Sequence, residues 1–173
     1  LVLYASWAAA RQGAQKLRDE GVSEVLLQGE DSLPALIKRF RSKRDSVLVG
    51  TMSLWQGVDV VGDSCRLVVI DKIPFPHPQN PIVKALTEDA DRQGGSGFFQ
   101  VSVTRAALMM AQGAGRLLRS HNDRGVVAVL DSRLQSRSYG RFIIQSMPEF
   151  WRTCDLDVVT GALERLNAEL HAD

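Results

Sequence analysis

The chain has 173 residues, a length typical of one globular domain, and 45% of its residues are apolar while 24% are charged. This composition excludes a mainly disordered chain, a collagen-like repeat and a coiled coil. The formal net charge of +1 provides no overall basic field for a nucleic acid, so any such binding has to use a local face. Two cysteines, Cys65 and Cys154, are too few for a disulfide framework or a thiolate metal site.

Short apolar runs alternate with helical patterns along the chain. Strands are expected at residues 1–5, 25–27, 47–50, 66–71 and 125–130. Helices are expected at residues 7–20, 31–44, 81–92, 98–120, 139–145 and 158–170, with a glycine-rich break at 94–97. Continuous apolar strands separated by helices predict an α/β fold with a parallel sheet covered by helices on both faces. Ligands of such sheets bind at the carboxyl ends of the strands.

Two arginines, Arg116 and Arg119, lie three residues apart in a helical pattern beside Gly113 and Gly115. Two guanidinium groups on one helical face suit a cluster of phosphate oxygens such as a triphosphate. The alternative is a solvated helix end whose cations complement the helix dipole. The glycines do not form a dinucleotide-binding fingerprint, because a helix rather than a strand precedes them and Leu118 occupies the third small position.

Two other patterns, at residues 57–59 and 38–44, each allow two interpretations. Gly57 and Asp59 follow a strand. The Asp59 carboxylate could accept hydrogen bonds from a ribose hydroxyl or an arginine, or it could cap a turn. The basic run at residues 38–44 is either a nucleic-acid patch or a solvated helix end at the amino-terminal edge of the sheet. The sequence contains no GxxxxGK[ST] motif, so the chain cannot cradle nucleotide phosphates by itself. The three histidines lack ligand-like neighbours at metal spacing, and we expect no metal site.

Taken in order, several motifs resemble those of DinG-type helicases, which are XPD-like DNA helicases of superfamily 2. The first piece, Ser6-Trp7, is similar to helicase motif IV. The similarity to motif V lies in residues 50–62, with the core Trp55-Gln56-Gly57-Val58-Asp59, and it continues into Asp71-Lys72-Ile73-Pro74-Phe75. The similarity to motif VI lies in residues 112–120, and Asp131-Ser132-Arg133 with Ser138-Tyr139-Gly140 fits the closing segment of the family. One departure is Gln56, where the family commonly has Glu.

The resemblance implies that residues 1–173 form the second RecA-like motor domain of such a helicase, with a helical insertion at about residues 78–100. In that role Arg119 would be the arginine finger and Arg116 would contact the γ-phosphate, both as catalytic residues. The nucleotide side would include Gly57, Asp59, Gln112 and Gly115. Residues on the DNA side would be Ser6, Thr51 and Ser53 as phosphate donors, Trp55 or Phe75 as stacking rings, and Arg133.

The resemblance also implies ATP and Mg²⁺ as cofactors, with the Mg²⁺ held mainly by a first lobe absent from this sequence, and no iron–sulfur cluster in this chain. The expected partners are single-stranded DNA and that first RecA-like lobe, in a cytoplasmic, nucleoid-associated protein without membrane association. Because the sequence starts on an apolar run without a methionine, we expect a piece of a longer protein. Two alternatives stay open: a free-standing nucleotide- or phosphate-binding α/β module, and a catalytically inactive helicase-like scaffold.

Overall fold

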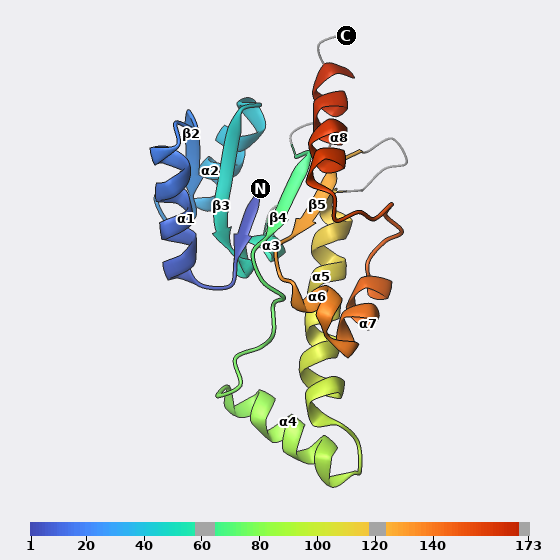
Figure 1. Ribbon diagram of the computed structural model, residues 1–173. Coiled ribbons are helices and arrows are strands. Elements are labelled where there is room, and N and C mark those ends of the chain that lie inside the picture. Colours follow the sequence, from blue (N-terminus) through green and yellow to red (C-terminus); the bar gives the residue numbers. More distant parts are fainter. Residues whose placement is uncertain (58–64, 118–123, 170–173) are drawn as a thin grey trace. The chain divides into compact units, whose positions relative to one another are not determined.

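The computed structural model describes residues 1–57, 65–117 and 124–169 (Figure 1). The chain divides into two compact units. Unit 1 consists of Leu1–Lys72, Arg116–Leu130 and Trp151–Asp173, and unit 2 consists of Ile73–Gly115 and Asp131–Phe150. Unit 1 contains the sheet, whereas unit 2 is helical.

The sheet of unit 1 has five parallel strands in the order β2-β3-β1-β4-β5. The strands are β1 (Val2–Tyr4), β2 (Glu24–Leu27), β3 (Ser46–Thr51), β4 (Leu67–Ile70) and β5 (Val126–Val129). At the centre, Val2 of β1 lies between Val49 of β3 and Val69 of β4. All five lie within a residue or two of the strands expected from the apolar runs, and the parallel α/β fold class is confirmed.

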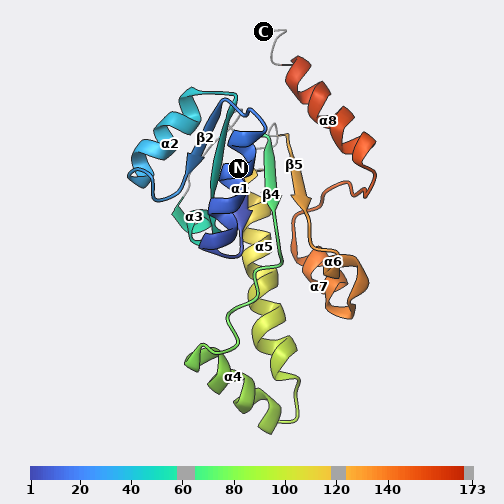
Figure 2. The ribbon, with the colours of Figure 1, turned by 60° about the vertical axis from the view of Figure 1, so that its left-hand side comes forward.

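Helices cover both faces of this sheet, as Figures 1 and 2 show for α1 (Trp7–Asp19) and α2 (Leu33–Ser42). The small residues Ala10 and Ala14 of α1 pack against Leu27 and Val49, where they are buried. Side chains alternate between faces along a strand, so Leu26 and Leu48 point to the opposite face, and both are buried. Leu36 and Phe40 are the buried residues of α2, and Leu54 is buried in α3 (Met52–Gly57).

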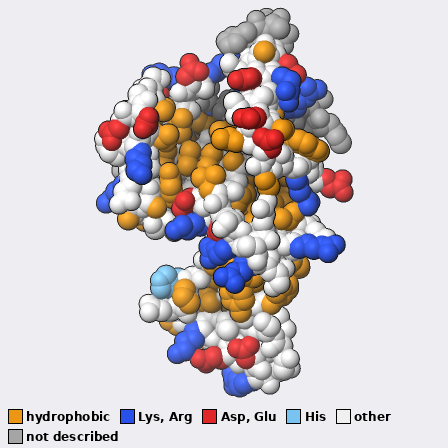
Figure 3. Space-filling view, in the orientation of Figure 1, with side chains coloured by type: hydrophobic (Ala, Val, Ile, Leu, Met, Phe, Trp, Pro, Cys, Tyr) orange, Lys and Arg blue, Asp and Glu red, His pale blue; other side chains and the backbone are white. Residues whose placement is uncertain are grey.

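Apolar side chains gather over the sheet of unit 1 in Figure 3, with charged side chains around them. On this unit, α8 (Leu156–Glu169) follows the exposed Trp151 and is tied to the strands by polar contacts. Arg66 Nη1 lies 3.3 Å from the carbonyl oxygen of Leu166, and Arg124 pairs with Glu169 at 3.2 Å. None of the helices among the described residues has the length and apolarity needed to cross a membrane.

Unit 2 is built from α4 (Pro81–Arg92), a π-helical segment η2 (Phe98–Val103), α5 (Thr104–Leu117, in this unit up to Gly115), α6 (Arg133–Ser136) and α7 (Ser138–Ser146). The Asn80 side chain accepts hydrogen bonds from the backbone N–H groups of Ile82 and Val83, and Pro81 occupies the first turn of α4. A Cβ at Gly140 would collide with the backbone of Leu134, so α6 and α7 touch through bare backbone.

The sequence predicted the long elements closely and missed two short ones. The helix expected at 98–120 is divided in the structure into η2 and α5. The last three residues of the expected helix, 118–120, lie outside the described part of the chain. Two helices were not predicted: α3 directly after β3, and the four-residue α6. Helices this short have no stable isolated form, so their sequences carry little signal.

Candidate nucleotide and nucleic-acid site

Polar side chains follow three neighbouring strands at the carboxyl edge of the unit 1 sheet. Ser6 comes after β1, Gln28 after β2, and Thr51 ends β3, with Ser53 in the first turn of the adjoining α3. Since the order of these strands is β2-β3-β1, the residues lie along one edge of one sheet. This is the edge at which parallel α/β sheets bind ligands.

The side chains of Thr51 and Ser53 are joined to Gln28 in a hydrogen-bonded cluster. The Thr51 N–H donates to Gln28 Oε1 at 2.9 Å, and Gln28 Nε2 donates to Ser53 Oγ at 3.2 Å. The two hydroxyl oxygens of Thr51 and Ser53 lie 2.8 Å apart. The two hydroxyls that were expected to contact phosphates are therefore brought together and held by an amide that the sequence analysis did not single out.

Ser6 has a structural role in which its hydroxyl oxygen is an acceptor. Its Oγ accepts a hydrogen bond from the Ala9 N–H at 3.2 Å, which caps the amino terminus of α1. The cap uses the hydroxyl oxygen as an acceptor, so the hydroxyl proton can still be donated to another group. Capping and phosphate contact are thus compatible at this residue.

Several of the predicted site residues lie outside what the structure describes. Asp59 and Arg119 fall in the segments 58–64 and 118–123, which the structure does not describe. Trp55, Gln56 and Gly57 lie within α3 and Arg116 lies near the end of α5, and for these four only the backbone element is described. Their expected roles stay predictions.

The two remaining nucleotide-side residues, Gln112 and Gly115, lie in one helix, α5. The side chain of Gln112 is exposed, and Gly115 is half-buried. A Cβ added at Gly115 would meet no described atom within 4 Å. Packing against the described residues therefore does not require a glycine at this helical position.

In unit 2, Arg133 and Phe75 are brought together by a carboxylate. The Asp131 side chain is only 6% exposed, and its Oδ2 lies 2.6 Å from Arg133 Nη2. Asp131 also accepts hydrogen bonds from the backbone N–H groups of Ile73 and Arg133, both at 3.0 Å. The guanidinium carbon of Arg133 lies 5.5 Å from the centre of the Phe75 ring, within the range of a cation–π contact.

Hydrogen bonds from Arg133 hold the pKa of the Asp131 carboxyl at about 2, below its ordinary value of 3.8, with help from the backbone N–H of Ile73. The pKa of Arg133 is raised in turn by the hydrogen bond to Asp131. The ion pair therefore remains charged throughout the neutral range. The carboxylate of Asp131 partly neutralises the charge of Arg133. The contacts to Asp131 use Nε and Nη2 of Arg133, so the N–H groups of Nη1 are not part of the ion pair.

Phe75 also belongs to an aromatic cluster of unit 2. Its ring centre lies 5.6 Å from that of Phe98 and 5.4 Å from that of Tyr139, and the Phe98 and Tyr139 centres are 5.7 Å apart. Phe98 is 48% exposed. The predicted stacking ring, Phe75, is thus half-buried among aromatic neighbours, whereas Phe98 presents more of its surface to solvent.

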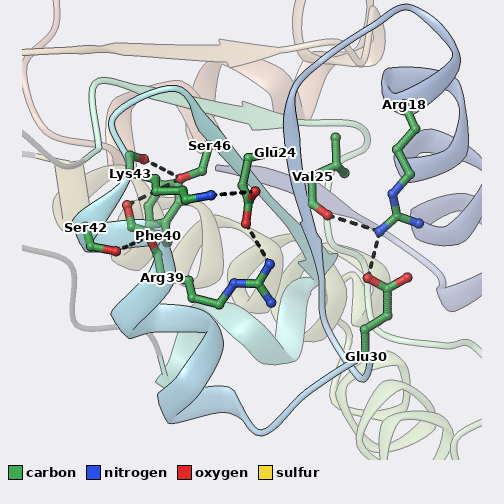
Figure 4. A network of polar contacts seen from close by, with 9 residues as sticks. All are labelled: Arg18, Glu24, Val25, Glu30, Arg39, Phe40, Ser42, Lys43 and Ser46. Atoms are coloured by element: carbon green, nitrogen blue, oxygen red, sulfur yellow. Dashed lines mark hydrogen bonds and ion pairs between the residues drawn. The ribbon is translucent and has the colours of Figure 1, made fainter.

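The basic run lies at the opposite edge of the sheet, as its sequence position predicted. It covers the end of α2 and the turn into β3, where Arg39 and Lys43 both pair with Glu24 of β2 (Figure 4). The distances are 2.6 Å and 3.0 Å, and the Glu24 side chain is 17% exposed. Two of the five basic side chains of the run thus share one carboxylate, which favours a solvated, partly neutralised helix end over a nucleic-acid patch.

Two polar residues with clear roles in these clusters, Gln28 and Asp131, were not among the predicted site residues. Gln28 directly follows a strand, so the expectation that ligands bind at the carboxyl ends of the strands could have pointed to it. Asp131 was noticed in the closing motif but received no role, because its contact with Ile73 links distant segments. Among the described residues no group of three potential metal ligands comes together.

Residues 1–150 match a protein family described as the helicase C-terminal domain. The chain is 48% identical over 166 residues to the ATP-dependent helicase DinG of Mycobacterium tuberculosis. The aligned residues make up 96% of this chain and 25% of that protein. The chain is 43% identical over 163 residues to the ATP-dependent DNA helicase YoaA of Haemophilus influenzae, covering 94% of this chain and 26% of that protein. The chain thus spans about a quarter of the length of these curated relatives.

A solved structure named XPD helicase has a similar fold, with a TM-score of 0.60 at 20% sequence identity. The likeness covers 84% of this chain and 27% of that one. The fold likeness agrees with the RecA-like sheet, and the sequence likeness confirms the DinG-type resemblance read from the motifs. The chain belongs to the helicase C-terminal domain family, in the form carried by DinG-type proteins.

Proposed function

We propose that this chain is the second motor lobe of an ATP-dependent DNA helicase and that it supplies an arginine finger and part of a single-stranded DNA track. The observation that carries the proposal is the row of hydroxyl and amide groups at the carboxyl edge of the sheet, at Ser6, Gln28, Thr51 and Ser53. Uncharged donors suit phosphate oxygens that a protein has to hold and release repeatedly. The names of the similar proteins, ATP-dependent helicases, support the same activity.

On the nucleotide side, Arg119 acts as the finger and Arg116 contacts the γ-phosphate, while Gly57, Asp59, Gln112 and Gly115 line the nucleotide. The described residues leave the α5 backbone open at Gly115, which supports this assignment because a ligand can approach there. Bound Mg²⁺ neutralises charge on the phosphates, and we assign it mainly to a first lobe that carries the P-loop missing from this sequence. The same first lobe is the proposed partner of this chain in a cytoplasmic, nucleoid-associated protein.

On the DNA side, we assign phosphate donation to the strand-end hydroxyls, base stacking to Trp55 or Phe75, and a further contact to Arg133. The Arg133 guanidinium keeps donors outside its pair with Asp131, and the aromatic cluster offers ring faces for bases. We assign residues 1–173 to one helicase domain, with α4 and the glycine-rich turn after it as the helical insertion at about residues 78–100.

The test is binding of a fluorescein-labelled oligo(dT) to the purified chain, followed by anisotropy over a series of salt concentrations. We expect weak binding whose logarithm falls linearly with the logarithm of the salt concentration, because phosphate contact releases counterions. The double variant Thr51→Ala, Ser53→Ala should bind roughly ten-fold or more weakly, since the loss of one hydrogen bond to a charged oxygen already costs about 1.5 kcal/mol or more.

The matched control is Arg39→Ala, which removes a cation at the opposite edge of the sheet and should leave the affinity unchanged. Affinity that stays constant across the salt series, or that falls with Arg39→Ala and not with the hydroxyl variants, would contradict the proposed DNA track.

A further inference from the structure

Gln28 lies where its side chain can control the two hydroxyls of the proposed DNA track. It directly follows β2, and its backbone N–H donates to the carbonyl oxygen of Val49 in β3 at 2.8 Å. This bond extends the β2–β3 ladder by one residue and fixes the start of the Gln28 side chain next to the end of β3. From there the amide reaches Thr51 and Ser53.

The hydrogen-bond pattern determines which way the Gln28 amide faces. A backbone N–H can only donate, so the atom of Gln28 that lies 2.9 Å from the Thr51 nitrogen has to be the carbonyl oxygen Oε1. That orientation directs the NH₂ group to Ser53, where Nε2 lies 3.2 Å from Oγ. The amide therefore accepts from the β3 backbone and donates to the Ser53 hydroxyl.

This donation uses one of the two acceptor positions of the Ser53 hydroxyl oxygen. The second acceptor position of Ser53 Oγ and the Ser53 proton stay available for other partners. Thr51 Oγ1 lies 2.8 Å from Ser53 Oγ and 3.4 Å from Gln28 Oε1, so the Thr51 proton has acceptors inside the cluster. The hydrogen bond between the two hydroxyls can run in either direction. In the direction in which Thr51 donates to Ser53, Ser53 Oγ accepts from both Gln28 and Thr51 and presents its proton outward, as an anionic oxygen requires.

Gly50 gives a second, independent sign that the chain is shaped around this amide. A Cβ added at Gly50 would lie 2.5 Å from Gln28 Oε1, 2.8 Å from Leu54 Cδ2 and 3.0 Å from Gln28 Cβ. Any side chain at position 50 would therefore displace the amide from Thr51 and Ser53. The bare backbone near the end of the buried strand β3 permits this close approach, although glycine inside a strand weakens the sheet.

We propose that Gln28 is a positioning residue that orients the Ser53 hydroxyl as a donor to a phosphate oxygen of single-stranded DNA. This inference rests on the proposed function and adds to it the residue that sets the polarity of the contact. Gln28 acts through Ser53, so removing Gln28 should cost nothing once Ser53 has lost its hydroxyl.

The test is a double-mutant cycle on oligo(dT) affinity with the variants Gln28→Leu, Ser53→Ala and their combination. We expect each single variant to bind roughly ten-fold more weakly and the combination to be no weaker than Ser53→Ala alone. A purely structural role predicts a different result: the loss from Gln28→Leu would persist in the Ser53→Ala background and would follow the loss of thermal stability.

The variant Gln28→Glu separates a loss of DNA affinity from a loss of folding stability. The carboxylate keeps an acceptor for the Thr51 N–H but gives Ser53 an acceptor in place of a donor, so the Ser53 proton turns inward. We expect affinity at least ten-fold below wild type with an unchanged thermal midpoint. Because the added charge also repels phosphate, the same substitution is measured in the Ser53→Ala background, where only the repulsion remains and the loss should be smaller.

The outcomes separate this inference from the proposed function. If the wild-type chain does not bind oligo(dT), the proposed function fails and the inference falls with it. If the wild-type chain binds and Ser53→Ala weakens binding while both Gln28 variants bind like wild type, the inference fails and the proposed function stands. Losses from Gln28→Leu and Ser53→Ala that simply add would also overturn it.

Discussion

Asp131 binds Arg133 through both of its carboxylate oxygens, with Arg133 Nε 2.9 Å from Oδ1 and Nη2 2.6 Å from Oδ2. The same carboxylate accepts the backbone N–H of Ile73, so it ties the segment after β4 to the start of α6. A nearly buried charge that receives this many donors is stabilised in its ionised form. The pair therefore holds the Arg133 guanidinium over the Phe75 ring.

Asp131→Asn should lower the free energy of unfolding at neutral pH by about 2 kcal/mol, which corresponds to a carboxyl pKa of about 2 in the folded chain against 3.8. Because the folded-state pKa is depressed, this stabilisation is present above about pH 4 and is lost as the pH falls toward 2. Urea unfolding of both proteins between pH 7 and 2.5 measures it. A difference between wild type and variant that stays constant with pH would contradict the assigned ion pair.

Gly115→Ala should stabilise the chain and impair nucleotide turnover. Replacing a glycine inside a helix by alanine gains about 0.5–1 kcal/mol, and no described atom opposes a Cβ here. If the nucleotide approaches α5 at this point, the methyl group obstructs it and ATP hydrolysis by a two-lobed protein containing this chain falls. Gly161→Ala in α8, where a Cβ meets only the Arg165 side-chain end at 3.4 Å, is the matched control and should change stability alone.

Arg119→Ala, in a two-lobed protein containing this chain, should lower kcat for ATP hydrolysis by roughly 10³-fold or more with little change in nucleotide Kd. A finger stabilises charge that develops during phosphoryl transfer, so its loss affects the transition state more than the bound substrate. Arg119→Lys should restore little activity, because lysine lacks the planar fork. Turnover is measured with saturating single-stranded DNA, and near-wild-type kcat in the alanine variant would leave Arg116 as the candidate finger.

The 173-residue chain by itself should hydrolyse ATP negligibly and bind it weakly, because the sequence has no P-loop to cradle the phosphates. Phosphate release and isothermal titration with ATP, each with and without oligo(dT), test this. DNA-stimulated turnover by the isolated chain would refute the division of the site between two lobes. Tight ATP binding without turnover would favour a free-standing nucleotide-binding module.

Gly140→Ala should destabilise unit 2 by about 2–3 kcal/mol, since the added methyl group overlaps the Leu134 backbone and backbone atoms cannot move aside cheaply. The substitution separates α6 from α7, so hydrogen exchange should rise over residues 133–146 and stay unchanged in the β1–β3 strands of unit 1. Unchanged exchange in α6 and α7 would mean that the two helices do not depend on this close contact.

The elements that the sequence predicted best have local causes. Asn80 and Pro81 mark the start of α4, and the helix observed, Pro81–Arg92, has the predicted bounds because cap and proline act within a few residues of each other. The helix α3 could not be foreseen in the same way, because it has six residues and depends on the complete burial of Leu54. Local patterns therefore identify long elements, whereas short elements depend on packing.

In the candidate site, too, some residues could be predicted from the local sequence, whereas the roles of others depend on contacts between distant segments. Thr51 and Ser53 were predicted as phosphate donors from the motif resemblance, and both follow directly on a strand, where parallel sheets bind ligands. The role of Gln28 depends on the register in which Leu27 pairs with Val49, and that register exists only once the sheet forms. The Asp131–Ile73 contact joins segments 58 residues apart, so no local pattern reveals it.

The central position of β1 has a consequence for synthesis on the ribosome. Val2 pairs with Val49 on one side and with Val69 on the other, so β1 is translated well before either neighbour exists. During that interval an apolar strand has two open edges, and such edges promote aggregation. Since its partners arrive in the order β3 and then β4, a nascent chain stalled between them would expose one edge of β1. Translation speed over residues 51–67 should therefore affect the yield of soluble protein more than translation speed beyond β5.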